Sequence, residues 1–291
     1  MKLQINPFLY REMRRYAGSR KFYIWLFIYE AFLTVVTGVG YHIALHTSWD
    51  QIMNYSGAAY VYFILAGILG LIVLLVVPSF AAGSLASEWE DRTMELLLAA
   101  SVKPSEIVVG KLLSSVWLAI FLVVAGMPFL SVVFIVGGIQ KRHLIQFLLL
   151  LVVESVFIGS IGVSLSAACQ KVDMAGLQSY AASMGLFVGT ALVAVVVYII
   201  ERTSQGGGDI VQKGSFGGVM LILLFNPLIT MASLLTDQMG YRNKFQELLC
   251  VLGPVPEFVM MHWCLISILI QMMVSIILLI LSKRKVEKYY L

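Results

Sequence analysis

Charged residues are scarce in this sequence, and their scarcity excludes an ordinary water-soluble globular protein. Asp, Glu, Lys and Arg make up 12% of the 291 residues, against about 25% in soluble domains, and 60% of the residues are hydrophobic. The mean hydropathy is +0.91. The long apolar runs lack the alternation of a barrel strand, and backbone groups in lipid must be satisfied within the segment. The sequence therefore predicts an all-α polytopic membrane protein.

Cysteines and catalytic motifs are also scarce. The three cysteines are odd in number and have no CxxC spacing, so neither a disulfide framework nor a zinc site is expected. The chain has no HExxH or GxSxG motif, and Ser105 stands where a phosphate-binding loop before Gly110 and Lys111 would need its first glycine. We therefore expect no metal, cofactor or ATP hydrolysis in this chain, and energised transport would need a motor on another subunit.

Six apolar blocks are long enough to cross a bilayer, which takes roughly 20 residues. We place them at Phe22–Leu45, Gly57–Ala82, Leu112–Val136, Leu144–Ala168, Ala175–Ile200 and Phe258–Leu281. With a cytoplasmic N-terminus, 14 of the 20 lysines and arginines fall on the inner side. The positive-inside rule thus predicts a multi-pass protein of the cell membrane, most consistent with a prokaryotic cytoplasmic membrane, with both termini in the cytoplasm.

Small residues inside these blocks suggest close helix contacts. The glycine pairs are Gly67 with Gly70, Gly159 with Gly162, and Gly185 with Gly189. Glycine lets two backbones approach, so these positions favour packing within the bundle over a specific dimer face.

The first 21 residues carry six basic side chains and lack the short apolar core and small-residue cleavage site of a removable signal peptide, so we expect them to stay attached. If Pro7 opens a helix, Arg11, Arg14 and Arg15 lie opposite an apolar arc. This pattern predicts an amphipathic helix over residues 1–21 that lies on the lipid headgroups, followed by a six-helix domain over residues 22–291. A basic flank without a defined helix is the alternative.

Residues 216–236 are apolar enough to be mistaken for a seventh span. They contain Asn226 and Pro227, and a seventh crossing would move the basic tail to the outer side. We prefer a broken, re-entrant or interfacial hairpin within an outer segment, residues 201–257. Gly253 and the two prolines after it would then turn the chain into the last span.

Two acids, Glu30 and Glu154, lie inside apolar blocks. A charge at the centre of a bilayer costs on the order of 2.5–3.5 kcal/mol on insertion scales, so each acid needs a partner, a watered cavity or a proton. Either acid could line a cavity, or could serve as a hydrogen-bonding group between helices.

The segment from Ser87 to Lys111 is a long polar interruption between the second and third blocks. Its first part, through Ala100, predicts a short helix that is charged at its front and apolar at its rear. A new helix is expected to begin near Ser105 and to run into the third span. The segment is either a cytoplasmic helix that a soluble partner grips or a solvated loop.

This segment resembles the cytoplasmic signature of ABC-2 type permeases, the membrane subunits of ATP-binding-cassette exporters. EWEDRTMELL at residues 88–97 and PSEIVVGK at residues 104–111 match its acid pair, Arg-Thr, Glu-x-Leu, Pro-Ser and Gly-Lys. NPFLYREMRR at residues 6–15 resembles the amphipathic elbow helix of the family. One departure is Arg92, where glycine is commoner in the family, so the turn at this position is open.

The resemblance implies a permease subunit that works with two separate cytoplasmic ATPase subunits, which would hold ATP and Mg. A second permease, identical or related, would complete a dimer in membrane lipid, and no nucleic acid partner is expected. The coupling helix that contacts the ATPase would carry Glu88, Glu90, Asp91, Arg92 and Glu95. Asn226 and Pro227 would help form an outer gate, and Glu30 and Glu154 are the candidate polar groups of a cavity.

By the same resemblance, the cargo would be hydrophobic or amphipathic, such as a peptide, a drug or a lipid-like molecule, exported by alternating access. The alternative function is a non-transporting scaffold, immunity or sensor subunit that binds a cytoplasmic partner. An intramembrane enzyme using Glu30 or Glu154 is a third hypothesis, disfavoured because no nucleophile, base or ligand set accompanies either acid.

Overall fold

The computed structural model describes residues 18–46, 55–94, 103–136, 139–204, 221–252 and 255–288. Within these ranges, six helical stretches are long and apolar enough to cross a membrane. They are Arg20–Ile43, Ala59–Glu90, Pro104–Val133, Lys141–Ser166, Val172–Ile200 and Trp263–Glu287. This confirms the all-α polytopic class and the number of spans. Most of the predicted elbow helix, with Arg11, Arg14 and Arg15, lies outside the described residues.

The helices of the first part of the chain are α2 (Arg20–His46), α3 (Tyr55–Glu90), α5 (Pro104–Val136) and α6 (Lys141–Ser166). The fifth span is made of α7 (Val172–Met184), a π-helical segment η1 (Gly185–Gly189) and α8 (Thr190–Ser204). A 3-10 helix η2 (Leu221–Phe225) then precedes α10 (Pro227–Gln238), α11 (Arg242–Leu252), α12 (Glu257–Met261) and α13 (Trp263–Glu287).

Three predicted boundaries are wrong by five to eight residues, which is about one and a half to two turns of helix. The second span continues as α3 to Glu90 instead of ending at Ala82, and α5 begins at Pro104 instead of Leu112. Proline suits the first position of a helix, where no backbone N–H is needed, and this confirms the predicted restart beside Ser105. The last span begins at Trp263, because the short helix α12 ends at Met261 and His262 is its C-cap.

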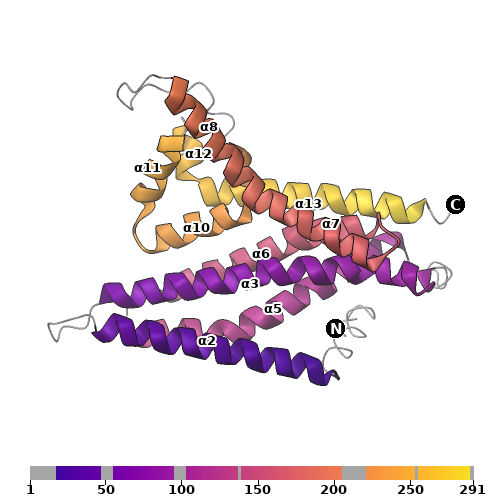
Figure 1. Ribbon diagram of the computed structural model, residues 1–291, viewed down its shortest axis with the longest axis horizontal. Helices are drawn as coiled ribbons and strands as arrows, with labels where there is room; N and C mark the ends of the chain where they lie inside the picture. Colours follow the sequence, from indigo (N-terminus) through magenta and orange to yellow (C-terminus); the bar gives the residue numbers. More distant parts are fainter. Residues whose placement is uncertain are drawn as a thin grey trace, which may run out of the picture. The chain divides into compact units, whose positions relative to one another are not determined.

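The chain divides into two compact units, Met1–Tyr180 with Ser275–Leu291, and Ala181–Val274. In unit 1, α3 contacts α2, α5 and α6, and α5 also contacts α2 and α6, so these four helices form one bundle (Figure 1). One core cluster joins Leu85 of α3, Ile107 and Leu112 of α5, and Val163 of α6. The end of α3 and the start of α5 therefore rest on the same apolar base.

Glycine contacts agree with the sequence at one of the three pairs. A Cβ at Gly162 would lie 2.5 Å from the Cβ of Ala81, and one at Gly159 would lie 2.9 Å from Leu112 Cδ1, so only glycine fits there without movement. Gly185 and Gly189 instead bound the π-helical segment, and a Cβ on either would meet no described atom within 4 Å. The packing prediction for that pair therefore has no support among the described residues and stays a prediction.

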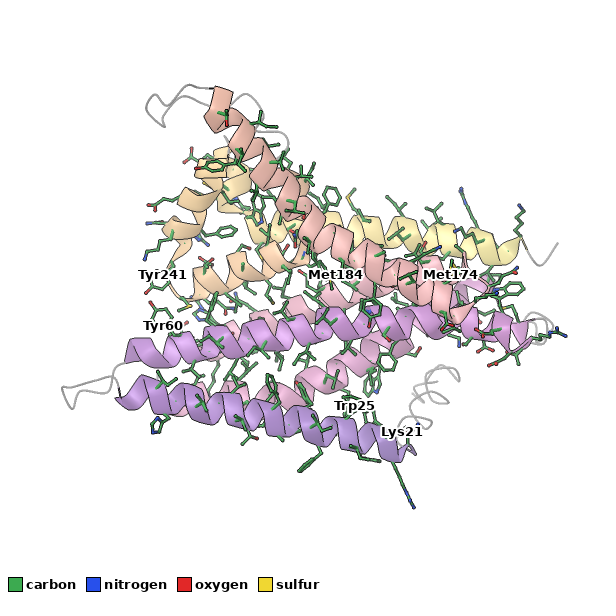
Figure 2. The ribbon with its side chains drawn as sticks, viewed as in Figure 1. Lys21, Trp25, Tyr60, Met174, Met184 and Tyr241 are labelled. Atoms are coloured by element: carbon green, nitrogen blue, oxygen red, sulfur yellow. The ribbon has the colours of Figure 1, made fainter. Side chains whose placement is uncertain are left out.

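The outer side of α2 is apolar and uncovered within the described structure. Trp25 projects from α2 with 71% of its surface exposed, and Phe27 is 74% exposed (Figure 2). Lys21 extends from the start of the same helix (Figure 2). A run of exposed apolar side chains along a helix is expected where lipid replaces water, which agrees with a membrane span.

Unit 2 contains the break that the sequence predicted inside residues 216–236. The chain passes from η2 through Asn226, whose backbone is extended, into α10. With 12 and 11 residues, α10 and α11 are too short to cross a bilayer, which takes roughly 20. Leu223, Leu249 and Trp263 contribute to the core of this unit. The break is thus confirmed, and the outer, re-entrant placement stays a prediction.

Candidate functional site

The end of α3 and the start of α5 are joined by a buried ion pair. The Nζ of Lys111 lies 2.8 Å from Glu88 Oε1, and the two side chains are 2% and 9% exposed. The hydroxyl of Thr93 donates to the second carboxylate oxygen, Oε2, at 2.5 Å. Both oxygens of Glu88 are therefore satisfied, as a carboxylate taken out of water requires.

The turn after α3 is a complete helix C-terminal motif. The amide of Thr93 donates to Glu88 O at 2.9 Å and the amide of Arg92 donates to Trp89 O at 3.1 Å, the two crossed bonds of a Schellman motif. Arg92 takes the left-handed position of this motif with φ 57°. Arg92 therefore adopts the backbone conformation that glycine favours, at the position where glycine is commoner in the family.

Charged side chains surround this turn on its exposed surface. They are Glu90, Asp91, Arg92, Lys103 and Glu106, and all of them are exposed. Beneath them, Met94 and Ile107 are 1% and 0% exposed and belong to the core cluster of unit 1. We call the exposed set, together with the buried pair of Glu88 and Lys111, the α3–α5 junction. It is a charged surface fixed to a buried apolar base.

Glu90 has a second role within the fold. Its Oε2 accepts a hydrogen bond at 3.0 Å from the backbone amide of Val172, the first residue of α7. The first amides of a helix have no partner inside the helix, so an acidic side chain placed there caps it. The α3–α5 junction is thereby connected to the start of the fifth span.

The structure separates the five predicted coupling residues into groups. Glu88 faces the interior, Glu90 faces α7, and Asp91 and Arg92 are exposed. Glu95 lies outside the described residues. Lys111, Thr93 and Val172 were missed as partners. The glycine-lysine at the end of the motif could have suggested Lys111, because a lysine entering an apolar helix needs a counterion.

Asn226 and Pro227, the predicted gate residues, sit at the break of unit 2. Asn226 is 1% exposed. Its side-chain oxygen accepts from Leu228 N at 2.9 Å and caps α10, while Pro227 occupies the first turn. Its amide nitrogen donates at 2.8 Å to both Phe187 O and Thr190 Oγ1. The break is therefore fastened to the π-helical segment of the fifth span.

A neutral polar cluster, missed by the sequence analysis, continues from this break into α13. Thr230 and Ser267 share a hydrogen bond of 2.5 Å, Ser267 donates to Leu224 O at 2.5 Å, and the amide of Gln271 donates to Thr230 at 3.0 Å. All three side chains are fully buried, at 0% exposure. Periodicity alone gives no sign that hydroxyls in separate apolar helices meet.

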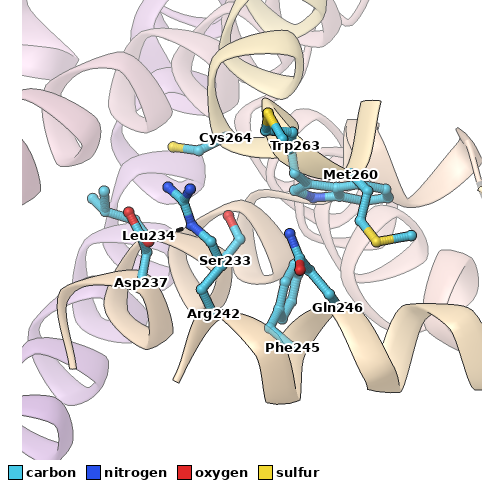
Figure 3. Close-up of a pocket in the computed structure, with 10 residues that line it drawn as sticks. Ser233, Leu234, Asp237, Arg242, Phe245, Gln246, Met260, Trp263 and Cys264 are labelled. Atoms are coloured by element: carbon cyan, nitrogen blue, oxygen red, sulfur yellow. Dashed lines mark hydrogen bonds and ion pairs between the residues drawn. The ribbon is translucent and has the colours of Figure 1, made fainter. Parts of the chain in front are cut away.

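A small pocket lies beside this cluster, between α10, α11 and the start of α13 (Figure 3). Arg242 and Asp237 form an ion pair at its edge, with Nε 2.6 Å from Oδ1, and Trp263 and Met260 supply apolar lining (Figure 3). The hydrogen bond and charge of Asp237 raise the pKa of Arg242 above its ordinary value. The two side chains of the pair are 52% and 43% exposed, so the pocket has a charged, open edge.

The two acids predicted within spans have different surroundings. Glu30 is half-buried on α2. Glu154, on α6, is 1% exposed, and neither of its carboxylate oxygens has a hydrogen-bond partner among the described residues. The structure does not bring the two acids together with the α3–α5 junction.

Comparison with protein families gives one match, to the family described as "ABC-2 family transporter protein", over residues 40–282. The matched region contains the α3–α5 junction, the break at Asn226 and nearly all of α13. No curated protein matches the chain.

Proposed function

The chain belongs to the ABC-2 family of transporter proteins, and from this premise we propose that it is the permease subunit of an exporter driven by separate ATPase subunits. The family implies association with ATP-binding-cassette ATPases. Two permeases, identical or related, would meet two ATPases, and ATP with Mg would be held by the ATPases. The six spans support a multi-pass membrane location, and we propose that both termini are cytoplasmic.

The α3–α5 junction is the observation that carries this proposal. Its charged residues face outward, and its interior is tied by Glu88 and Lys111 across the ends of two spans. A push on the exposed turn would therefore move α3 and α5 together instead of deforming a loop. An ATPase that closes on ATP would use Asp91, Arg92 and Glu106 as its contact, and Glu88 would hold their platform.

The proposed cargo is hydrophobic or amphipathic. The buried polar side chains that join Asn226, Thr230 and Gln271 are neutral, and they lie in the unit that contains the predicted outer gate. A gate region whose buried polar groups are amides and hydroxyls suits molecules with few charges. Movement of the break at Asn226 would open and close the outer side during alternating access.

Co-purification with the partner ATPase tests the junction. We expect Asp91→Lys combined with Glu106→Lys to abolish co-purification, because both acids are exposed there, while membrane insertion and thermal stability stay unchanged. Glu88→Lys is a poorer test, since it would place a second lysine against Lys111 in the interior.

The matched control is Glu247→Lys combined with Glu257→Lys, which makes the same charge change on exposed residues of α11 and α12. The control should keep the ATPase. Retention of the ATPase by the junction variant would contradict the proposed contact. An assembled complex whose ATP hydrolysis never changes its conformation would favour the scaffold or sensor alternative.

A further inference from the structure

The fifth span is fastened at two separate places, and the two fastenings lie on one continuous helical stretch. At its start, Glu90 caps α7 through the amide of Val172. Farther along, Asn226 holds the π-helical segment through Phe187 O. The backbone on either side of η1, at Met184 and Thr190, stays in the right-handed helical region.

The first half of this stretch runs along α3. The hydroxyl of Ser179 donates to Pro78 O at 3.3 Å, and that of Tyr180 donates to Leu75 O at 3.1 Å. Proline within a helix removes a backbone N–H and loosens the ladder around it, so hydroxyls from a neighbour can bond carbonyls there. Ala175 packs between these bonds and the Glu90 cap, against small residues of α3.

Contacts of this kind allow α3 and α7 to move as one piece. Gly162 of α6 makes the packing tighter, since a Cβ at this position would lie 2.5 Å from Ala81 of α3 and 3.2 Å from Ser179 Oγ of α7. Three helices thus meet at one position without room for a methyl group. A displacement of the end of α3 is passed to α7 through direct contact.

The π-helical segment η1 follows α7 directly and forms a wider helical turn. A π-helical segment holds one more residue per turn, so it can absorb a change in direction or length, and such segments are frequent at functional positions. Asn226 bonds both Phe187 O and Thr190 Oγ1, at 2.8 Å each. The same side chain caps α10, so a shift of η1 reaches the start of α10 through one residue.

We infer that α7 and η1 carry the movement of the α3–α5 junction to the break at Asn226, with Glu90 and Asn226 as positioning residues at the two ends. The inference rests on the proposed function for the origin of the movement. It adds that the predicted outer gate is driven through the fifth span, and that Glu90 serves this connection in place of contact with the ATPase.

Hydrogen exchange in the full complex tests this inference without a known cargo. The permease with its ATPase, in lipid nanodiscs, is compared without nucleotide and after trapping with ATP and vanadate. We expect the exchange rate of residues 185–190 and 227–230 to change by about 5-fold or more, the lower end of typical coupling between linked sites.

Four variants separate the steps. Glu90→Ala should weaken the change at residues 185–190, since the bonds of Ser179 and Tyr180 to α3 remain, and Glu90→Gln should keep the full change, because an amide oxygen still accepts from Val172. Asp173→Ala is the matched control, since it removes another exposed acid from the first turn of α7 and should keep the change. Asn226→Ser keeps a capping oxygen but loses the bond to Phe187, so residues 227–230 should stop responding.

An undiminished nucleotide response in Glu90→Ala, or an equal loss in Asp173→Ala, would overturn the inference. If the wild-type chain binds no ATPase, the proposed function fails. The connection along the fifth span can then still be tested by hydrogen exchange on the permease alone. In that case Glu90→Ala should speed exchange both at residues 172–176 and at residues 185–190. A faster exchange that stops within the first turn of α7 would show that the cap is local.

Discussion

Two buried carboxylates of unit 1 have opposite surroundings. Glu88, at the end of α3, is 7% exposed and has a lysine and a threonine hydroxyl on its two oxygens. Glu154, in the middle of α6, is 1% exposed, and neither oxygen has a partner within the described structure. Both are acids in helices of one bundle, so the difference lies in what surrounds them.

The comparison shows that burial alone does not tell whether an acid holds two helices together. Glu88 does so through its partners, whereas Glu154 has none among the described residues. A buried pair loses its hydration but regains charge attraction and hydrogen bonds, and removal of one partner then leaves an uncompensated charge. An unpartnered acid has lost its hydration without gaining hydrogen bonds or charge attraction. Its replacement by an apolar residue should therefore stabilise the fold. Substitution at the two sites should therefore change stability in opposite directions.

The largest expected effect is at the paired acid. Lys111→Met should lower the free energy of unfolding by about 3–5 kcal/mol, because Glu88 is left buried without its counterion. The measurement is unfolding in mixed detergent micelles, followed by tryptophan fluorescence. The double variant Lys111→Met with Glu88→Gln should recover most of the loss, since the amide can still accept from Thr93. Equal stability of the single variant and the wild type would contradict a fastening role.

Hydropathy and turn residues were sufficient to predict the parts of the fold that depend on local sequence. The number of spans, the helix restart beside Pro104 and the break at Asn226 and Pro227 follow from apolar run length and from proline, which acts within a few residues. The family resemblance placed function on the segment of residues 87–111, and the match over residues 40–282 confirms the family.

The connections between helices within the site could not be predicted, because they join residues far apart in the chain. Glu90 meets Val172 across 82 positions and Asn226 meets Phe187 across 39. Sequence spacing says nothing about which helices become neighbours, so all the acids of residues 88–95 were assigned outward. The wrong end for the second span had a local cause, since Ser87, Glu88 and Glu90 are polar but continue α3.

The second effect tests the unpartnered acid. Glu154→Leu should raise the free energy of unfolding by about 1–3 kcal/mol, because a buried carboxyl without hydrogen bonds is replaced by an apolar side chain of similar volume. Glu154→Gln, which keeps a buried polar group, should stay near the wild type. A loss of stability in the leucine variant would show that Glu154 has a partner in the native protein and would remove the contrast with Glu88.

The same leucine variant also separates the two interpretations of Glu154 that the sequence left open. If Glu154 is only a structural group, its replacement should leave the nucleotide-driven conformational change intact once stability is retained. If Glu154 lines the transport cavity, its replacement should impair that change. A stabilised Glu154→Leu protein that assembles with the ATPase but no longer responds to ATP would therefore assign Glu154 to the transport path.

The smallest expected effect is at Arg92, in the turn that follows α3. Arg92 has φ 57°, a conformation that costs a non-glycine residue about 1 kcal/mol or more. Arg92→Gly removes that cost but frees the unfolded chain by about 0.4–1 kcal/mol, so the net gain in stability should be below about 1 kcal/mol. Asp91→Gly, in the same turn but without a positive φ, should lose stability in the same unfolding assay.

Arg92→Gly also removes an exposed charge from the proposed ATPase contact. Its stability and its co-purification should therefore diverge: a fold at least as stable as the wild type, with weaker retention of the ATPase. If both stay at the wild-type level, the turn geometry is what the ATPase recognises, and the arginine side chain is dispensable. If both stability and co-purification fall, the Arg92 side chain itself stabilises the turn, as Glu88 does. Glycine suits the backbone at this position, so a loss of stability could come only from the lost side chain.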